Sequence, residues 1–193
     1  AQTPSVVHFT LEADIVLENW TSVDFSASLD GQGHGISGLT KPLFGALTGA
    51  TVENLVISNS TVVAAASGEI AGLLARTAGD GTTIRHVLTA SDCTVGVGNN
   101  VLAGGIVGEL SNTKTDGGGW DSWIIDSTNR ASLAKTSTDS NSSGAFAGIV
   151  GRIKAKGATG QPFVTNGVLR CANFGSLTCN CKGGRMGGIV GKF

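Results

Sequence analysis

A short phrase of small and aliphatic residues recurs along the chain and constrains its fold more than any other feature. The copies are AGLLART (71–77), AGGIVGEL (103–110), FAGIVGRI (146–153), GGIVGKF (187–193) and the more degenerate PLFGAL (42–47). Aligning the central small residue gives a column of Gly45, Ala75, Gly108, Gly151 and Gly191, at intervals of 30, 33, 43 and 40 residues. Self-similarity at such a period is typical of proteins built from stacked repeats.

A second pattern, rich in β-branched residues, recurs between these phrases. It occupies 51–63, 83–95, 122–133 and 166–177, and it aligns Leu55, Val87, Ile124 and Val168 in one column. The apolar runs are too short for helices, and Gly, Asn, Ser and Asp separate them. We therefore predict an all-β protein, a right-handed parallel β-helix (β-solenoid), in which each repeat forms a three-strand coil that pairs in parallel with its neighbours.

The repeat spacing predicts a single domain, 1–193, of about five to six coils. The opening coil is expected at 1–41, the repeat coils at 42–71, 72–104, 105–147 and 148–187, and the start of a further coil at 188–193. The longer intervals indicate two inserted loops, 112–122 and 154–162, which should lie at the same corner of neighbouring coils.

Glycine is expected to form the corners of these coils. The chain has 30 glycines and three prolines. At Gly104 and Gly105 we expect a positive φ, and at Gly108 a position without room for a Cβ. Replacing such a glycine with a larger residue should cost several kcal/mol, because strain and clashes add together.

Composition argues against several classes of partner and favours a secreted protein. The net charge is −1 and 14% of residues are charged, so neither a nucleic acid nor an anionic membrane is an expected partner. No apolar run approaches the roughly 18 residues that span a bilayer. The opening AQTPS would suit a mature N-terminus after signal-peptide cleavage, and Asn19, Asn59 and Asn141 occupy glycosylation sequons. We predict an extracellular or cell-surface location.

No group of residues in the sequence predicts catalysis, a metal or a cofactor. Gly33-His34-Gly35 and Arg152-Ile153-Lys154 also occur in polygalacturonases, which are right-handed β-helices, but the acidic pairs that inverting hydrolysis requires are missing here. The histidines lie on different coils without metal-ligand spacing, and His86 shares a column with Asn54, which indicates a polar bend. We predict a protein that is not an enzyme, with a polysaccharide-active enzyme as the alternative.

The stretch TDGGGWDSW (115–123) holds the best candidate ligand-binding residues, which are Asp116, Trp120, Asp121 and Trp123. Paired carboxylates beside an aromatic platform would suit a sugar or calcium. The other interpretation is a glycine-rich loop whose Trp123 packs back over the coil. Both interpretations remain open at this point.

The four cysteines offer a candidate disulfide bond near the C-terminal end of the sequence. Cys93 lies about two coils from Cys171, so we expect Cys93 to be an unpaired ladder residue or a small residue that fills the core. In an oxidising compartment Cys171 could bond to Cys179 or Cys181. The Cys-Asn-Cys spacing does not make a zinc site, because other ligands are missing.

Three of the phrases, GGIVGEL, AGIVGRI and GGIVGKF, resemble the GLUG-type repeats of bacterial and protist surface proteins. The stretches LEADIVL (11–17) and 26–57 look like the segment that commonly opens such arrays. The resemblance implies a β-solenoid in extracellular proteins, including adhesins and non-catalytic regions of surface proteases, and it implies no catalytic residue. We therefore expect a non-enzymatic extracellular structural or adhesive protein. Its expected partners are copies of itself, stacked end to end into a fibre, or host and matrix glycans and proteins, with no membrane insertion in this segment. The alternative is a carbohydrate-binding or carbohydrate-active module that uses the 112–123 loop.

Overall fold

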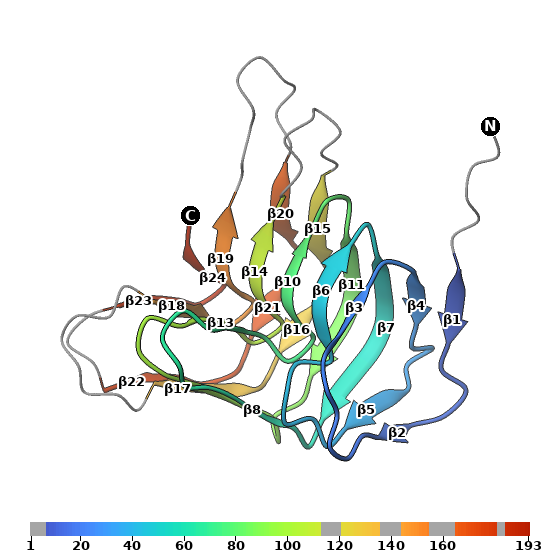
Figure 1. Cartoon of the computed structure of the whole chain (residues 1–193), viewed down its shortest axis with the longest axis horizontal. Coiled ribbons are helices and arrows are strands. Elements are labelled where there is room, and N and C mark those ends of the chain that lie inside the picture. Colours follow the sequence, from blue (N-terminus) through green and yellow to red (C-terminus); the bar gives the residue numbers. More distant parts are fainter. Residues whose placement is uncertain (1–6, 113–120, 136–143, 155–164, 181–183) are drawn as a thin grey trace.

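The computed structural model describes residues 7–112, 121–135, 144–154, 165–180 and 184–193, and it is built from parallel strands (Figure 1). Every strand pairing among these residues is parallel, and none of them lies in a helix. None of these residues therefore forms a helix that could cross a membrane. The predicted all-β class is confirmed, and the stacked parallel sheets are those of a β-solenoid.

Four sheets run along the molecule, each formed by equivalent strands of successive repeats. The main path of the first sheet is β1 (His8–Thr10), β4 (Ser28–Asp30), β7 (Thr51–Ser58), β11 (Thr83–Thr89), β15 (Ser122–Ile125) and β20 (Asn166–Leu169). Four short strands also belong to it: β2 (Ile15–Val16), β5 (Gly35–Ser37), β16 (Thr128–Asn129) and β21 (Ala172–Asn173). The second sheet consists of β3 (Val23–Phe25), β6 (Phe44–Thr48), β10 (Ala75–Gly79), β14 (Val107–Ser111), β19 (Val150–Lys154) and β24 (Val190–Lys192).

The other two sheets project to one side as an arm (Figure 1). One contains β8 (Thr61–Ala64), β12 (Thr94–Val97), β17 (Ser132–Lys135) and β22 (Leu177–Cys179). The other contains β9 (Ile70–Ala71), β13 (Leu102–Gly104), β18 (Ala145–Ala147) and β23 (Arg185–Gly187). Residues 7–48 add no strand to either sheet, so the arm starts at β8 and β9. The expectation of three strands in every coil is thus wrong for the later repeats, which pass through all four sheets.

Stacked aliphatic side chains fill the interior. Val52 pairs with Ile84, Ile84 with Ile124, and Ile124 with Val168, and the first three are completely buried. Strands such as β7 and β8 alternate between buried and more exposed residues, as a strand with one face in a core must. The core therefore extends as a continuous column through the solenoid.

The predicted column of Leu55, Val87, Ile124 and Val168 is only half right. Val87 does pair with Leu55, but Ile124 pairs with Ile84, three residues earlier. The cause is a bend within the first sheet that the apolar pattern does not reveal. Each of Asn54, His86, Asp126 and Arg170 has a φ between 49° and 52°, and together they form this bend. The predicted bend at Asn54 and His86 is confirmed.

In the AGLLART copy of the repeated phrase, the strand register differs by one residue from the alignment that the sequence suggested. Ala75 pairs with Phe44 on one side and with Val107 on the other, so Arg76 rather than Ala75 is the equivalent of Gly108. Since Arg76 is exposed at a position where the other repeats have glycine, it places a cation beside the start of the arm.

The glycine corners depend on close packing rather than on backbone conformation. Gly104 and Gly105 do not have a positive φ, so that expectation is wrong. Instead, a Cβ at Gly104 would lie 2.6 Å from the carbonyl oxygen of Ile149, in the next repeat. The expectation for Gly108 is confirmed, because a Cβ there would lie 2.7 Å from the carbonyl oxygen of Arg76.

The flanks of the two predicted insertions lie next to each other. β14 leads into 112–122 and pairs with β19, which leads into 154–162. β15 and β20 follow the two insertions and also pair with each other. Most residues of both insertions lie outside the described ranges.

Candidate functional site

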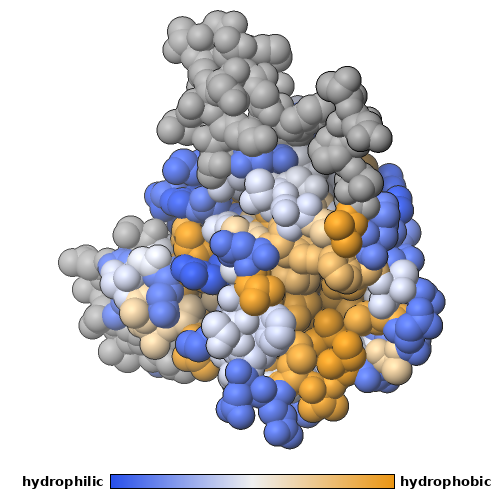
Figure 2. All heavy atoms as spheres, turned by 45° about the vertical axis from the view of Figure 1, so that its right-hand side comes forward, coloured by the Kyte–Doolittle hydropathy of each residue, from blue (hydrophilic) through white to orange (hydrophobic). Residues whose placement is uncertain are grey.

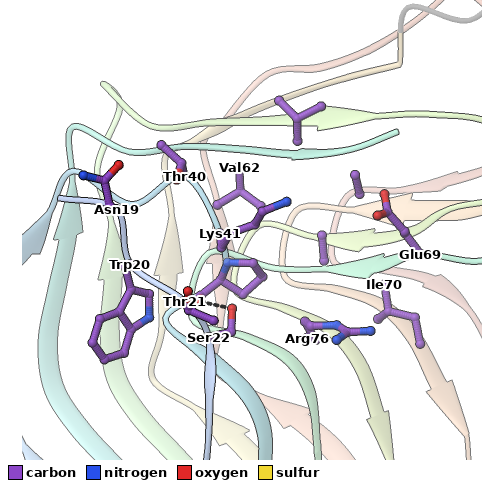
Figure 3. A pocket seen from close by; sticks show the side chains of 14 residues that line it. Asn19, Trp20, Thr21, Ser22, Thr40, Lys41, Val62, Glu69, Ile70 and Arg76 are labelled. Carbon is purple, nitrogen blue, oxygen red and sulfur yellow. Dashed lines mark hydrogen bonds between the residues drawn. The ribbon is translucent and has the colours of Figure 1, made fainter. Parts of the chain in front are cut away.

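The start of the arm leaves a groove on the side of the molecule (Figure 3). It has a volume of about 510 Å³, within the range of small-ligand sites. Two connecting segments, 19–22 and 40–42, form one side, and strands β8 and β9 form the other. The groove exists because the repeats before residue 49 have no strands equivalent to β8 and β9.

Two hydrogen bonds fasten the connecting segments to each other. The indole Nε1–H of Trp20 donates to the carbonyl oxygen of Leu43 at 2.8 Å, and the hydroxyl of Ser22 donates to that of Pro42 at 2.5 Å. Trp20 also packs against the hydrophobic core. These contacts hold one side of the groove in place without a ligand.

The charged side chains of the groove are mainly cationic. Figure 3 shows Lys41 between Trp20 on one side and Arg76 and Glu69 on the other. Glu69 accepts a hydrogen bond from the backbone N–H of Ala66 at 2.9 Å. Among the described residues, neither Lys41 nor Arg76 forms an ion pair, and both are exposed. An anionic ligand would therefore meet two cations and only one carboxylate.

A second polar feature, which we call the polar ladder, follows the bend in the first sheet. It consists of Asp30, Asn54, His86, Asp126 and Arg170. Asn54 donates to Asp30 at 3.0 Å and lies 3.2 Å from the His86 ring, while Arg170 donates to both carboxylate oxygens of Asp126 at 2.6 and 2.7 Å. Neighbouring repeats therefore satisfy one another's polar groups at this position.

The Asp126–Arg170 contact makes the polar ladder sensitive to pH. The hydrogen bond from Arg170 is the main cause that holds the pKa of Asp126 below its ordinary value. Because the pKa of Asp126 is lower in the folded than in the unfolded protein, its contact with Arg170 stabilises the fold above the unfolded pKa. This stabilisation is lost as pH falls through the folded pKa. We expect Arg170→Met to return the Asp126 pKa towards its ordinary value, as measured by an NMR titration of the carboxyl carbon. An unchanged titration midpoint would contradict this assignment, and Arg130→Met serves as the control.

Two further polar contacts are buried. Glu109 is 6% exposed and receives the guanidinium of Arg152, whose Nε donates at 2.6 Å. Asn129 is completely buried, donates to Asn173 at 2.7 Å and contacts the hydroxyl of Thr89. Each buried group is thus satisfied by the neighbouring repeat, as burial requires.

The described ranges include only part of the predicted 115–123 site. Asp116 and Trp120 lie outside them. Asp121 accepts the backbone N–H of Thr165 at 2.6 Å, and Trp123 is half-buried against Gly167, where a Cβ would lie within 3.0 Å of its ring. Trp123 therefore packs on the neighbouring repeat. The carbohydrate-binding role of this loop stays a prediction.

The predicted histidine and glycosylation positions are spread over the surface. His34 lies 3.3 Å from Asp14, and His86 belongs to the polar ladder. The described part of the chain contains no group of three residues able to hold a metal ion. Asn19 and Asn59 are exposed, while Asn141 lies outside the described ranges. Glycosylation stays a prediction.

The cysteines differ from expectation at one position. Cys93 is a buried free thiol, as predicted, and burial raises its pKa to about 11. Cys171 is also free, and burial raises its pKa. The suggested bond from Cys171 to Cys179 or Cys181 is therefore not formed. Cys179 is disulfide-bonded, and Cys181 lies outside the described ranges.

Together the sheets, the groove and the polar ladder define the class of protein: a parallel-stranded β-solenoid with an arm that begins partway along it. No protein-family model matches the chain, and no curated protein is similar to it in sequence. A crystal structure from Bacteroides ovatus named "putative immunoglobulin A1 protease" is similar in fold, with a TM-score of 0.70 and 22% sequence identity. The match covers 99% of this chain and 56% of that one, so this chain spans little more than half of its neighbour's length. At this identity the likeness shows the fold alone.

Proposed function

We propose that the protein is a non-enzymatic structural or adhesive β-solenoid of the extracellular surface, related to GLUG-type repeat proteins. The proposal rests on the hydrogen-bond and ion-pair partners of the polar side chains. The polar ladder, the Glu109–Arg152 pair and the buried Asn129 are all satisfied by neighbouring repeats, so their side chains serve the stacking of the solenoid. The finer architecture that we propose is right-handed, with five to six coils, because parallel crossovers are nearly always right-handed.

The name of the structural neighbour determines the first assay. The purified chain should be incubated with immunoglobulin A1 and, separately, with polygalacturonate, and the products should be analysed by electrophoresis and reducing-end assay. We expect neither substrate to be cleaved, and we expect binding to be detected when immobilised glycans and matrix proteins are screened. Cleavage of either substrate by the purified chain would overturn the proposal and favour the enzyme alternative.

End-to-end stacking is the second part of the proposal, and the surface at the two ends of the solenoid supports it. Figure 2 brings the N-terminal end forward and shows a broad hydrophobic area on it. The apolar residues most exposed at this end are Val7, Phe9, Ile15, Val16 and Val23. At the opposite end Leu169, Phe174, Met186 and Phe193 are exposed. A contact between unlike ends of identical molecules propagates into a filament unless its rotation closes a ring.

We expect sedimentation velocity to show oligomers that grow with protein concentration. Val16→Asp should reduce this association by about tenfold or more, because a charge would be buried in the apolar contact. Val63→Asp is the matched control, since Val63 is 54% exposed but lies on the side of the molecule. A protein that stays monomeric at all concentrations, or equal effects of the two variants, would refute end-to-end stacking.

A further inference from the structure

Strand β8 has an unpaired edge that faces the groove. It is the first strand of its sheet, and its one strand partner among the described residues is β12. The carbonyl oxygens of Ser60 and Ala64 accept hydrogen bonds from the β12 side, from Thr94 and Gly98. The N–H of Thr61 points the other way and donates to the carbonyl oxygen of Leu39, in the preceding repeat, at 2.9 Å.

The alternation of backbone groups along a strand extends this pattern to Val63. Residues two apart in a strand direct their N–H and C=O groups to the same side, so those of Val63 point towards the groove, as the N–H of Thr61 does. For β12, β17 and β22, the other strands of this sheet, the preceding repeat provides a strand at that side. At β8 the place of that strand is taken by the groove, which lies between β8 and the segment 40–42.

The side chains around this edge add an apolar contact and positive charge. Val63 is 54% exposed, so its apolar side chain is accessible at this edge. Lys41 and Arg76 are unpaired among the described residues, and Glu69 already accepts a backbone hydrogen bond. A ligand that fits all three features offers backbone hydrogen bonds at strand spacing, apolar side chains and negative charge.

We propose that the groove binds an extended acidic peptide segment of another protein, which adds to the edge of β8 as a further strand. Strand addition of this kind obtains affinity from main-chain hydrogen bonds and specificity from side-chain contacts. A second copy that paired through its own β8 edge is disfavoured as the occupant, because it would bring the same two cations into the groove. An acidic saccharide would satisfy the cations but would leave the backbone edge of Val63 without a strand partner. This inference rests on the binding role proposed above and adds the class of ligand.

The direct test uses a short fluorescent peptide of alternating glutamate and valine, whose binding is followed by anisotropy at low salt. The first control is the same peptide with alternate backbone nitrogens methylated, which keeps the charge but removes the hydrogen bonds of a strand. We expect methylation to weaken binding by about tenfold or more, and replacement of glutamate by lysine to abolish it. A second control is oligogalacturonate, which carries similar charge without a peptide backbone and should bind at least tenfold more weakly.

Variants of the protein locate the site. Val63→Pro removes the outward N–H at an edge position where proline is tolerated, and it should weaken peptide binding by about tenfold, whereas Val63→Thr, which keeps that N–H, should not. Lys41→Glu combined with Arg76→Glu should also weaken binding by about tenfold or more. Arg130→Glu is the charge-reversal control for each single change, because Arg130 lies against Phe174, at the C-terminal end of the solenoid, and should have little effect.

Several results would overturn the inference. They are equal binding of the methylated and unmethylated peptides, tighter binding of oligogalacturonate than of the peptide, full binding by the Lys41/Arg76 double variant, and no binding of the peptide. Should Val63→Pro fail to fold, as judged by circular dichroism, the methylated peptide decides the question alone. Failure here accompanied by glycan or matrix binding elsewhere would leave the proposed function intact, whereas cleavage of immunoglobulin A1 would remove the proposed function itself.

Discussion

Gly105→Ala is expected to lower the free energy of unfolding by about 3–5 kcal/mol, whereas Gly188→Ala should change it by about 0.5 kcal/mol or less. The two glycines occupy the same position of the repeated phrase, since Gly104 pairs with Ala147 and Ala147 with Gly187. A Cβ at Gly105 would lie well under 3.0 Å from the carbonyl oxygen of Gly148 and the side chain of Asn129. A Cβ at Gly188 would have no described atom within 4 Å.

The measurement is equilibrium unfolding in denaturant, monitored by circular dichroism, with both variants compared with the unsubstituted chain. The backbone obstructs the Cβ at Gly105, so side-chain rotation alone cannot relieve the clash. Equal destabilisation by the two substitutions would mean that backbone conformation rather than the neighbouring repeat requires glycine here. A negligible effect of Gly105→Ala would contradict the close packing of the phrase.

Arg152→Met is expected to destabilise the protein by about 3 kcal/mol or more, because it leaves the buried carboxylate of Glu109 without its partner. Glu109 is 6% exposed, and the Arg152 guanidinium contacts its Oε2 through two nitrogens. Removing one member of a buried pair leaves a charge in a medium that solvates it poorly.

The double variant Glu109→Gln/Arg152→Met provides the control for that prediction. It removes both charges, so it should recover about half or more of the lost stability in the same unfolding assay. Arg85→Met is the comparison at the surface. Arg85 pairs with Glu53, but its side chain is 49% exposed, so its loss should cost about 1 kcal/mol or less. A double variant less stable than Arg152→Met would show that the charge on Glu109 is not the cause.

The repeated phrase was sufficient to predict the fold class, because alternating apolar residues and a regular period leave few ways to bury the aliphatic side chains. The register was harder to predict. His86, Asp126 and Arg170 are chemically unlike, so nothing in their residue types marks them as a common bend, although they share a positive φ with Asn54. The alignment of the repeats by their apolar residues is therefore wrong by three residues between Val87 and Ile124.

The groove was not predicted, although one signal for it was present. The stretch from Gly45 to Gly108 contains the segment TVVA (61–64), whereas the chain before Gly45 has no equivalent of it. That difference in repeat content marks the start of the arm. The cationic character of the groove could not be foreseen, because the alignment that placed Ala75 opposite Gly108 hid the substitution of Arg76 for a glycine.

Because the arm starts partway along the solenoid, the length of the solenoid and the lining of the groove can change independently of each other. All the residues that line the groove lie between Asn19 and Arg76, and the repeats beyond them only lengthen the stack. Gain or loss of later repeats would therefore alter the reach of the rod without altering what its groove recognises. Proteins of this kind that differ in the number of later repeats would differ in length but would keep the same partner.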